Sequence, residues 1–249
     1  MYFETNDGKM NYEVIGKGKT IIFLHGWGQN LNTFNRIATP LKDEYRIILV
    51  DFLGFGLSDE PEHVIGVDNY VNHLRSLIEY LDIKSPILIA HSFGGRVAIK
   101  YAAKYFVDKL VLVDSAGIKV KSFKKCYKIM KYKLIKKFYY YFFKTKYEKL
   151  IATSGSVDYK NASPIMKGVL SKVVNEDLKK YLKKLTTDTL IIWGIFDNDT
   201  LYKHGQIMNK LIRKSKLINF YKSGHFPYID EEKKFINELR LFLKRIEYV

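Results

Sequence analysis

The chain has 249 residues, of which 47 % are hydrophobic and 27 % are charged, and its formal net charge is +16. This composition suits one large globular domain and excludes an intrinsically disordered chain, because enough apolar material is present to fill a core. No apolar run approaches the roughly 18 residues of a membrane span. The first residues lack the pattern of a secretory signal, so we expect none. We also expect no internal disulfide, since only one cysteine is present, and both features favour a cytoplasmic protein.

The positive charge is concentrated in one segment. Residues 118–185 hold 19 Lys, no Arg and four acidic residues, so they carry +15 of the net charge of +16. A strongly basic chain can bind nucleic acid or an acidic membrane. Proteins that read bases depend on the planar guanidinium of Arg, which this segment lacks, so we expect no nucleic-acid partner.

The first elements of the chain form a predicted hairpin. Residues 1–5 and 10–15 have the pattern of strands, and Asn6-Asp7-Gly8 between them favours a tight turn. Short apolar runs then recur along the chain, at residues 20–26, 46–54, 86–92, 109–115, 189–194 and 217–221. Runs that are apolar at consecutive positions are typical of parallel strands buried on both faces.

Helical patterns alternate with these predicted strands. Apolar residues recur on one helical face at Val71, Leu74, Ile78 and Leu81, and on another at Phe235, Leu239, Phe242 and Ile246. The alternation predicts an α/β fold, in which helices cover a mostly parallel, doubly wound sheet that begins with the hairpin. In such a sheet, functional residues gather at the carboxyl ends of the strands.

One segment interrupts the alternation. Residues 118–185 have helical periodicity and no strand pattern, so we predict a helical cap inserted into a core domain made of residues 1–117 and 186–249. The clearest helix of this cap has an apolar stripe of residues three or four positions apart, namely Phe123, Tyr127, Met130, Leu134, Phe138 and Tyr141. The stripe either roofs an apolar pocket or lies on anionic lipid together with the neighbouring lysines. We favour the roof, and therefore expect little binding to membranes.

The strongest chemical signal is the sequence Ala90-His91-Ser92-Phe93-Gly94-Gly95, which lies between a predicted strand and a predicted helix. A strand that turns abruptly into a helix holds a serine in an exposed, strained position, provided that the residues two before and two after the serine are small. Gly94 meets this requirement, and Ala90 meets it with one methyl group more than the usual glycine. We therefore predict that Ser92 is a nucleophile.

A serine hydroxyl becomes an effective nucleophile when a neighbouring base takes its proton, and imidazole suits this task because it titrates near neutrality. His225 is the best-placed base, since it lies in the loop after the last predicted strand. The histidine needs an acid to fix its tautomer, and Asp197 follows the strand at 189–194. Asp199 and Asp114 are alternative acids, but we favour Asp197 because it fits the spacing after Trp193-Gly194.

With the serine, the acid and the histidine in this order, the chain resembles the α/β-hydrolase fold superfamily over essentially its whole length. The sequence His-Gly-Trp-Gly at residues 25–28 and the loop at 51–59 also match that superfamily. The resemblance implies an oxyanion hole made of the backbone N–H groups of Trp27 and Phe93, a structural role for His25, and a bracing role for the loop. Phe93 opens a predicted helix, where unpaired N–H groups favour negative charge.

These residues predict a serine hydrolase that cleaves a carboxylic ester or thioester of a small apolar acyl group, without a metal or a cofactor. Candidate substrate contacts are His91, Phe123, Tyr127, Met130, Leu134 and Phe138. One alternative is a carbon–carbon hydrolase or a lyase on the same triad, since Phe93-Gly94-Gly95-Arg96 resembles the elbow of the menaquinone-pathway synthase and Arg96 could bind a substrate carboxylate. The other alternative is a non-catalytic binding or signalling protein of the same fold.

Overall fold

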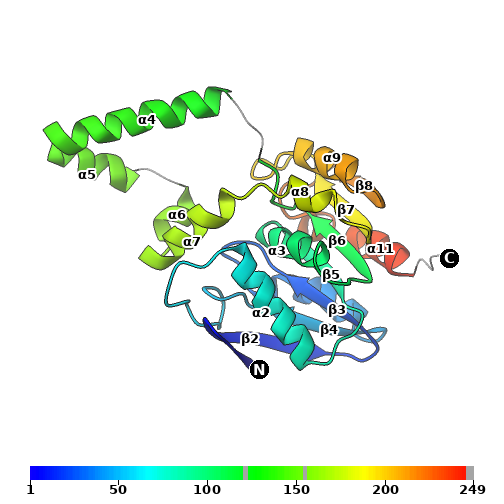
Figure 1. The fold of residues 1–249 in the computed structure, drawn as a ribbon. Coiled ribbons are helices and arrows are strands. Elements are labelled where there is room, and N and C mark those ends of the chain that lie inside the picture. Colours follow the sequence, from blue (N-terminus) through cyan, green and yellow to red (C-terminus); the bar gives the residue numbers. More distant parts are fainter. Residues whose placement is uncertain (120–122, 154–155, 245–249) are drawn as a thin grey trace.

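The computed structural model describes residues 1–119, 123–153 and 156–244. Within them, eight strands form one sheet in the order β1-β2-β4-β3-β5-β6-β7-β8 (Figure 1). The strands are β1 Tyr2–Thr5, β2 Gly8–Ile15, β3 Lys19–Leu24, β4 Tyr45–Val50, β5 Ile87–His91, β6 Lys109–Val113, β7 Asp188–Gly194 and β8 Ser215–Phe220. The predicted strands therefore all form, with small differences at their ends.

The sheet is mostly parallel, as predicted. β1 and β2 pair antiparallel across the tight turn, β2 pairs antiparallel with β4, and every later pair from β4 to β8 is parallel. Successive side chains of a strand point to opposite faces of the sheet. In β3, Ile22 and Leu24 enter one buried cluster while Ile21 and Phe23 enter a second, which explains why the strand is apolar at consecutive positions.

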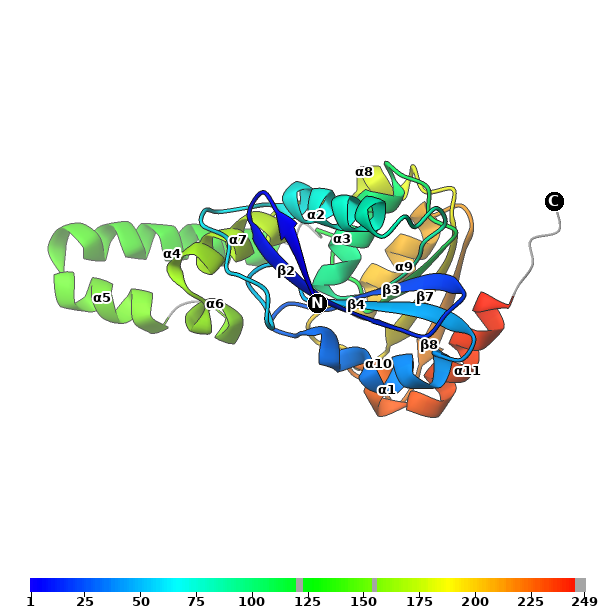
Figure 2. The ribbon, with the colours of Figure 1, turned by 90° about the horizontal axis from the view of Figure 1, so that it is seen from below.

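Helices cover both faces of this sheet (Figure 2). One face is covered by α2 Val67–Tyr80, α3 Phe93–Ala102, α8 Lys179–Leu182 and α9 Tyr202–Leu211, and the other by η1 Leu31–Phe34, α1 Asn35–Ala38, η2 Thr39–Leu41, α10 Pro227–Asp230 and α11 Glu232–Leu243. The predicted apolar faces of α2 and α11 are buried, and Leu81 follows α2 as its C-cap. Ile246 lies outside the described residues.

Between β6 and α8, the described residues form four more helices. They are α4 Phe123–Phe142, α5 Lys144–Thr153, α6 Val157–Asn161 and α7 Pro164–Val174. α7 returns to the sheet, where Met166, Val169 and Val173 are buried in the same cluster as α2 and α3. α4 and α5 instead run side by side away from the rest of the molecule (Figures 1 and 2). Among the described helices, none is both long enough and apolar enough to cross a membrane.

The expected roof over the sheet edge is not formed by the apolar stripe of α4. Met130, Leu134 and Phe138 are 55 %, 63 % and 52 % exposed. The reason is that α4 packs along α5 and extends beyond the sheet instead of folding back over it. The side chains of Phe123 and Tyr127 lie outside the described residues.

Candidate active site

Ser92 lies in the sharp turn between β5 and α3. Its φ of 46° and ψ of −109° are strained for a residue that is not glycine. Backbone hydrogen bonds hold the turn in place. The N–H of Ser92 donates to the carbonyl of Val113 at 3.1 Å, and its carbonyl accepts from the N–H groups of Gly95 at 3.1 Å and Ala116 at 2.9 Å. The serine is therefore fixed between two strand ends, with a half-buried side chain.

The two glycines after Ser92 are required by close packing. A Cβ atom on Gly94 would collide with the carbonyl oxygen of Leu24, and a Cβ on Gly95 would collide with the side chain of Ser115. The N–H of Gly94 also donates to the carbonyl of His25 at 3.0 Å, which ties the start of α3 to the turn after β3. The small residues in this motif therefore allow the turn and bring it close to the neighbouring loop.

His225 lies in the loop after β8, and its Nδ1 atom donates to Oδ2 of Asp197 at 2.8 Å. Oδ2 also accepts from the hydroxyl of Thr200 at 2.6 Å, and Oδ1 accepts from the N–H groups of Asp199 at 2.7 Å and Thr200 at 3.0 Å. Burial raises the pKa of Asp197, but the hydrogen bonds from His225 and Thr200 outweigh it and lower that pKa to about 2. Asp197 is therefore an ionised acceptor that fixes the orientation of the imidazole.

The two alternative acids occupy different positions. Asp199 contributes its backbone N–H to Asp197. Asp114, at the end of β6, is fully buried; its Oδ1 accepts from the N–H of Gly194 at 3.0 Å, and its Oδ2 has no hydrogen-bond partner among the described residues. Burial, together with the neighbouring Asp197, raises the pKa of Asp114 to about 10. Asp114 is therefore neutral near pH 7 and does not pair with His225.

The carboxyl groups of Asp114 and Asp197 and the ring of His225 lie within 4.8 Å of one another, which is close enough for a metal ion. The donor chemistry fits an ion poorly. Nδ1 of His225 and Oδ2 of Asp197 already bond to each other, and a neutral carboxyl such as Asp114 is a weak ligand. The cluster fits a hydrogen-bonded catalytic pair better than a metal centre.

We expected His91 to contact the substrate, but it lies behind His225. Its side chain is buried, its Nε2 donates to the backbone carbonyl of His225 at 2.8 Å, and the two rings are 4.7 Å apart. The hydroxyl of Tyr228 lies 3.4 Å from Nδ1 of His91. Burial lowers the pKa of His91 to about 3, so the ring is neutral and supports the histidine loop from within the protein.

The backbone N–H groups of Trp27 and Phe93 are the predicted donors of the oxyanion hole. Trp27 lies in the turn after β3 and Phe93 is the first residue of α3, and their rings are 5.6 Å apart. Within the part of the chain that the structure describes, neither N–H donates to a protein acceptor. Free N–H groups at a helix start stabilise negative charge. The arrangement suits an oxyanion that forms beside Ser92.

His25 and the loop at 51–59 hold this turn. Nδ1 of His25 donates to the carbonyl of Gly26 at 2.7 Å, and Nε2 accepts from the N–H of Phe52 at 3.0 Å. Burial lowers the pKa of His25 to about 4, which keeps Nε2 free to accept. Asp51 accepts from the N–H groups of Leu31 at 2.7 Å and Leu57 at 2.9 Å. These residues position the turn through hydrogen bonds.

The hydrogen bond between Ser92 and the ring of His225 is not formed among the described residues. Such contacts commonly tighten when a substrate is bound. The topology brings the two residues together, since Ser92 directly follows β5 and its neighbour His91 bonds to the carbonyl of His225.

Sequence reasoning missed the residues of α6 and α7 near the site. The carboxyl group of Asp158 lies 3.9 Å from the place where Gly28 would carry a Cβ, and the thioether of Met166 packs against Gly54. The sequence held part of the signal, because Ser-Pro at residues 163 and 164 is a common helix start. In the structure, Ser163 caps α7 by accepting from the N–H of Met166 at 3.1 Å. α6 and α7 therefore lie closer to the site than α4 does.

The side chain of Arg96 makes a structural contact. It is buried, and Nη1 donates to the backbone carbonyl of Glu176 at 2.9 Å. Nearby, the buried Nζ of Lys100 pairs with Glu176 at 2.6 Å and with Asp68 at 2.7 Å. Arg96 and Lys100 therefore fasten the segment after α7 to α2 and α3.

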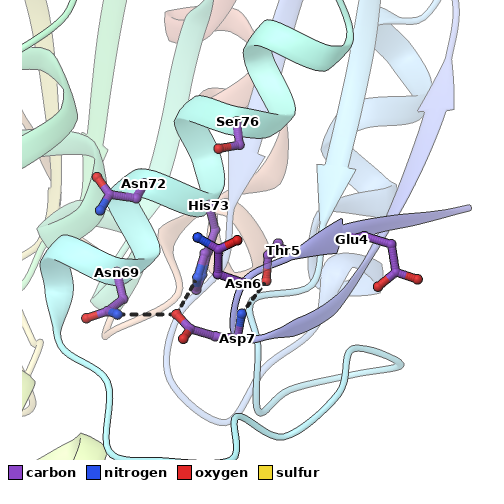
Figure 3. Close-up of a pocket in the computed structure, with 8 residues that line it drawn as sticks. All are labelled: Glu4, Thr5, Asn6, Asp7, Asn69, Asn72, His73 and Ser76. Carbon is purple, nitrogen blue, oxygen red and sulfur yellow. Dashed lines mark hydrogen bonds and ion pairs between the residues drawn. The ribbon is translucent and has the colours of Figure 1, made fainter.

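A polar pocket of about 210 Å³ lies between the β1–β2 turn and α2 (Figure 3). Asp7 accepts there from His73 at 2.7 Å and from Asn69 at 3.2 Å. None of the residues around Ser92 lines this pocket. Its hydrogen bonds attach the hairpin to α2 and place no catalytic group.

Comparisons with known proteins agree with the fold. A family model described as alpha/beta hydrolase fold matches residues 19–128. An AB hydrolase superfamily protein of Bacillus subtilis is 31 % identical over 91 % of this chain and 92 % of its own length. Lipase 1 of Psychrobacter immobilis is 27 % identical over 89 % of this chain and 76 % of its own. The solved esterase from Exiguobacterium antarcticum has a TM-score of 0.75 and 26 % identity, and covers 96 % of both chains.

Proposed function

The chain belongs to the α/β-hydrolase superfamily, and on that premise we propose that it is a serine hydrolase that cleaves a carboxylic ester or thioester through an acyl-enzyme on Ser92. The observation that carries the proposal is the hydrogen bond between His225 and the ionised Asp197 at the same sheet edge as the strained Ser92. An ester substrate is favoured by the similarity to a lipase and an esterase.

In the proposed first step, His225 removes the proton of the Ser92 hydroxyl while the oxygen attacks the acyl carbon. Asp197 stabilises the imidazolium that forms. The N–H groups of Trp27 and Phe93 donate to the oxygen that becomes negative. When the tetrahedral intermediate collapses, the bond from the acyl carbon to the leaving oxygen or sulfur breaks, and His225 returns the proton to the leaving group.

The second step reverses the first with water as the nucleophile. His225 removes a proton from water, the hydroxide adds to the acyl carbon, and the bond to Ser92 breaks as the serine recovers its proton. The products are a carboxylic acid and an alcohol or thiol. Every proton transfer uses His225, and the residues described need no cofactor for these steps.

The carbon–carbon hydrolase or lyase alternative has less support. It relied on Arg96 to bind a substrate carboxylate, but the guanidinium is buried against Glu176. Burial lowers the pKa of Arg96 to about 10, which still leaves it charged near pH 7 and held by the carbonyl. The non-catalytic alternative has less support because the serine, acid and histidine are all present and the acid and base are paired.

The test is hydrolysis of a short-chain 4-nitrophenyl ester by the wild-type protein and by Ser92→Ala. We expect kcat to fall by about 10⁴ to 10⁶, because the serine and its base act as one unit. A serine-directed phosphonate should add its mass to the peptide that contains Ser92. Ser76→Ala, at an exposed serine of α2, is the matched control and should behave as wild type. Equal turnover by Ser92→Ala would refute the proposal.

A further inference from the structure

The part of α4 and α5 at residues 130–150, here called the arm, extends away from the rest of the molecule. None of its side chains is buried. Its large apolar residues are instead open to solvent, and Met130, Leu134, Phe138, Tyr140, Tyr141, Phe142 and Phe143 are all exposed. A soluble monomer rarely presents so much contiguous apolar surface without a binding role.

The exposed residues of α4 form an ordered face. Met130, Leu134, Phe138, Tyr141 and Phe142 are spaced by three or four positions, with one shorter step at the end, so they share one side of the helix. The half-buried Tyr132 and Tyr139 lie on another side, and the half-buried Ile135 lies at the border of the exposed face, two turns before Phe142. α5 packs on α4, and the rings of Tyr140 and Tyr147 are 5.3 Å apart between their centroids. The open apolar face is therefore separate from the contact between the two helices.

The charge of the arm is strongly one-sided. Residues 130–150 contain seven lysines and one acidic residue, Glu148, beside eight aromatic residues. Lys133, Lys137 and Lys144 are exposed. Lys146 lies over the ring of Phe143 at 4.9 Å, so this cation and an aromatic ring share one patch of surface. Aromatic and aliphatic side chains that alternate with lysine suit the boundary between lipid headgroups and acyl chains.

We propose that the arm binds the surface of an anionic lipid membrane, with Leu134, Phe138 and Phe142 entering the acyl boundary and the surrounding lysines contacting the headgroups. The exposure of the stripe reverses the expectation of weak membrane binding, which depended on the stripe roofing the site. A nucleic acid would match the charge but would leave the aliphatic residues Met130 and Leu134 in water. A second copy of the arm would bring two sets of lysines together, and their repulsion opposes this contact.

The arm is well placed for such contact. The inserted segment leaves the sheet at the carboxyl end of β6, the edge that also holds Ser92 and His225, and the arm extends away from the body of the molecule (Figure 1). A membrane can therefore meet the arm without displacing the helices that cover the sheet. Membrane binding by the arm does not depend on the proposed hydrolysis, so each can fail alone.

The test is co-sedimentation of the full chain with vesicles of phosphatidylcholine alone or of phosphatidylcholine with phosphatidylglycerol. We expect binding to the anionic vesicles only. Raising the salt from about 0.1 M to about 1 M shortens the Debye length from about 10 Å to about 3 Å, so most binding should be lost. Circular dichroism of each variant without vesicles provides the independent measure of a folded protein.

Two sets of substitutions separate the charged and apolar contributions. Replacing Lys133, Lys137 and Lys144 by Gln should weaken binding to anionic vesicles about 100-fold, at about five-fold for each lysine near the surface. The matched control replaces the exposed lysines Lys203, Lys210 and Lys216, on α9 and β8, and should bind as wild type although its net charge is the same.

The apolar contribution is tested by Leu134→Ser with Phe142→Ser, which should weaken binding at least ten-fold without changing the net charge. Three results would overturn the proposal: equal binding to neutral and anionic vesicles, equal loss in the two lysine variants, or no vesicle binding. Retention of a duplex oligonucleotide without vesicle binding would assign the arm to nucleic acid, and a lysine-independent dimer in sedimentation would assign it to a second copy.

Discussion

Helices α2 and α4 have the same kind of apolar stripe and opposite surroundings. Val71, Leu74 and Ile78 recur at helical spacing and are buried against the sheet. Met130 and Leu134 recur at the same spacing and are exposed. Periodicity therefore identifies one face of a helix, but it does not identify what that face contacts.

The difference arises from how each helix is connected. α2 links β4 and β5, two parallel strands that lie on either side of β3, so its crossover must lie against the sheet. α4 belongs to an insertion of several helices, and other helices of that insertion, α7 above all, supply the apolar residues that pack on the core. The candidate active site and the arm should therefore respond very differently to substitution.

The largest effect is expected at the candidate active site. Asp197→Asn should lower kcat for an ester by about 10⁴, because an amide at this position favours the wrong tautomer of His225. Asp199→Asn is the matched control, since Asp199 contributes through its backbone N–H, and it should stay within a few-fold of wild type. Steady-state kinetics of the two variants measure the contrast. A larger loss for Asp199→Asn would mean that the acid has been assigned incorrectly.

The second prediction compares how substitutions in the two stripes change the free energy of unfolding. Leu74→Ala should reduce the free energy of unfolding by about 2 to 5 kcal/mol, because it opens a cavity in the core. Leu134→Ala should change it by less than about 0.5 kcal/mol, because the side chain is already in water. Denaturant unfolding of both variants checks the difference. A similar cost at the two positions would show that the stripe of α4 is buried in solution.

The third effect is a dependence of stability on pH. The pKa of Asp114 is raised from 3.8 to about 10, so the folded protein holds a proton that the unfolded chain releases above pH about 4. Its contribution to stability is full below that pH and is lost as the pH rises toward 10. Asp114→Asn, which has no such proton, should become more stable relative to wild type as the pH rises.

Unfolding of the wild-type and Asp114→Asn proteins at several pH values tests this sign. A stability difference that does not vary with pH would mean that Asp114 is ionised in the folded protein. The kcat of Asp114→Asn should stay within about ten-fold of wild type, because Asp197, and not Asp114, bonds to His225.

The smallest effect is expected for substrate choice. Leu134→Ala and Phe138→Ala should leave the preference for acyl chain length of soluble esters unchanged, because both side chains point to solvent in the arm. Rates with a series of 4-nitrophenyl esters measure this preference. Met166→Ala is the informative comparison, because Met166 packs against Gly54 near the site. This substitution should change the chain-length preference. A changed chain-length preference in either arm variant would indicate that the stripe contacts the substrate.

Local signals predicted the fold well. Consecutive apolar residues identified the parallel strands, and the small residues around Ser92 identified a turn whose tight packing leaves no room for side chains at Gly94 or Gly95. These features depend on neighbours in sequence or on the general rules of parallel sheets. The sequence could therefore indicate them without knowledge of the tertiary contacts.

Features that depend on tertiary contacts could not be predicted in this way. His91 adjoins the serine in sequence, yet its burial behind His225 follows from the path of the loop after β8. The spacing after Trp193-Gly194 favoured Asp197 over Asp114, but it could not indicate how the surroundings of the two carboxyl groups differ. The structure differentiates them by hydrogen bonding, because one carboxyl has several donors and the other has an oxygen without a partner.

The exposure of the arm has a consequence for its evolution. Since none of its described side chains is buried, selection for a folded protein places little constraint on residues 130–150. Substitutions there should accumulate freely unless an interaction outside the chain removes them. If closely related sequences retain both the lysines and the aromatic residues of the arm, this conservation would indicate that the arm binds a partner. Without such binding, we expect only residues that favour a helix to be retained.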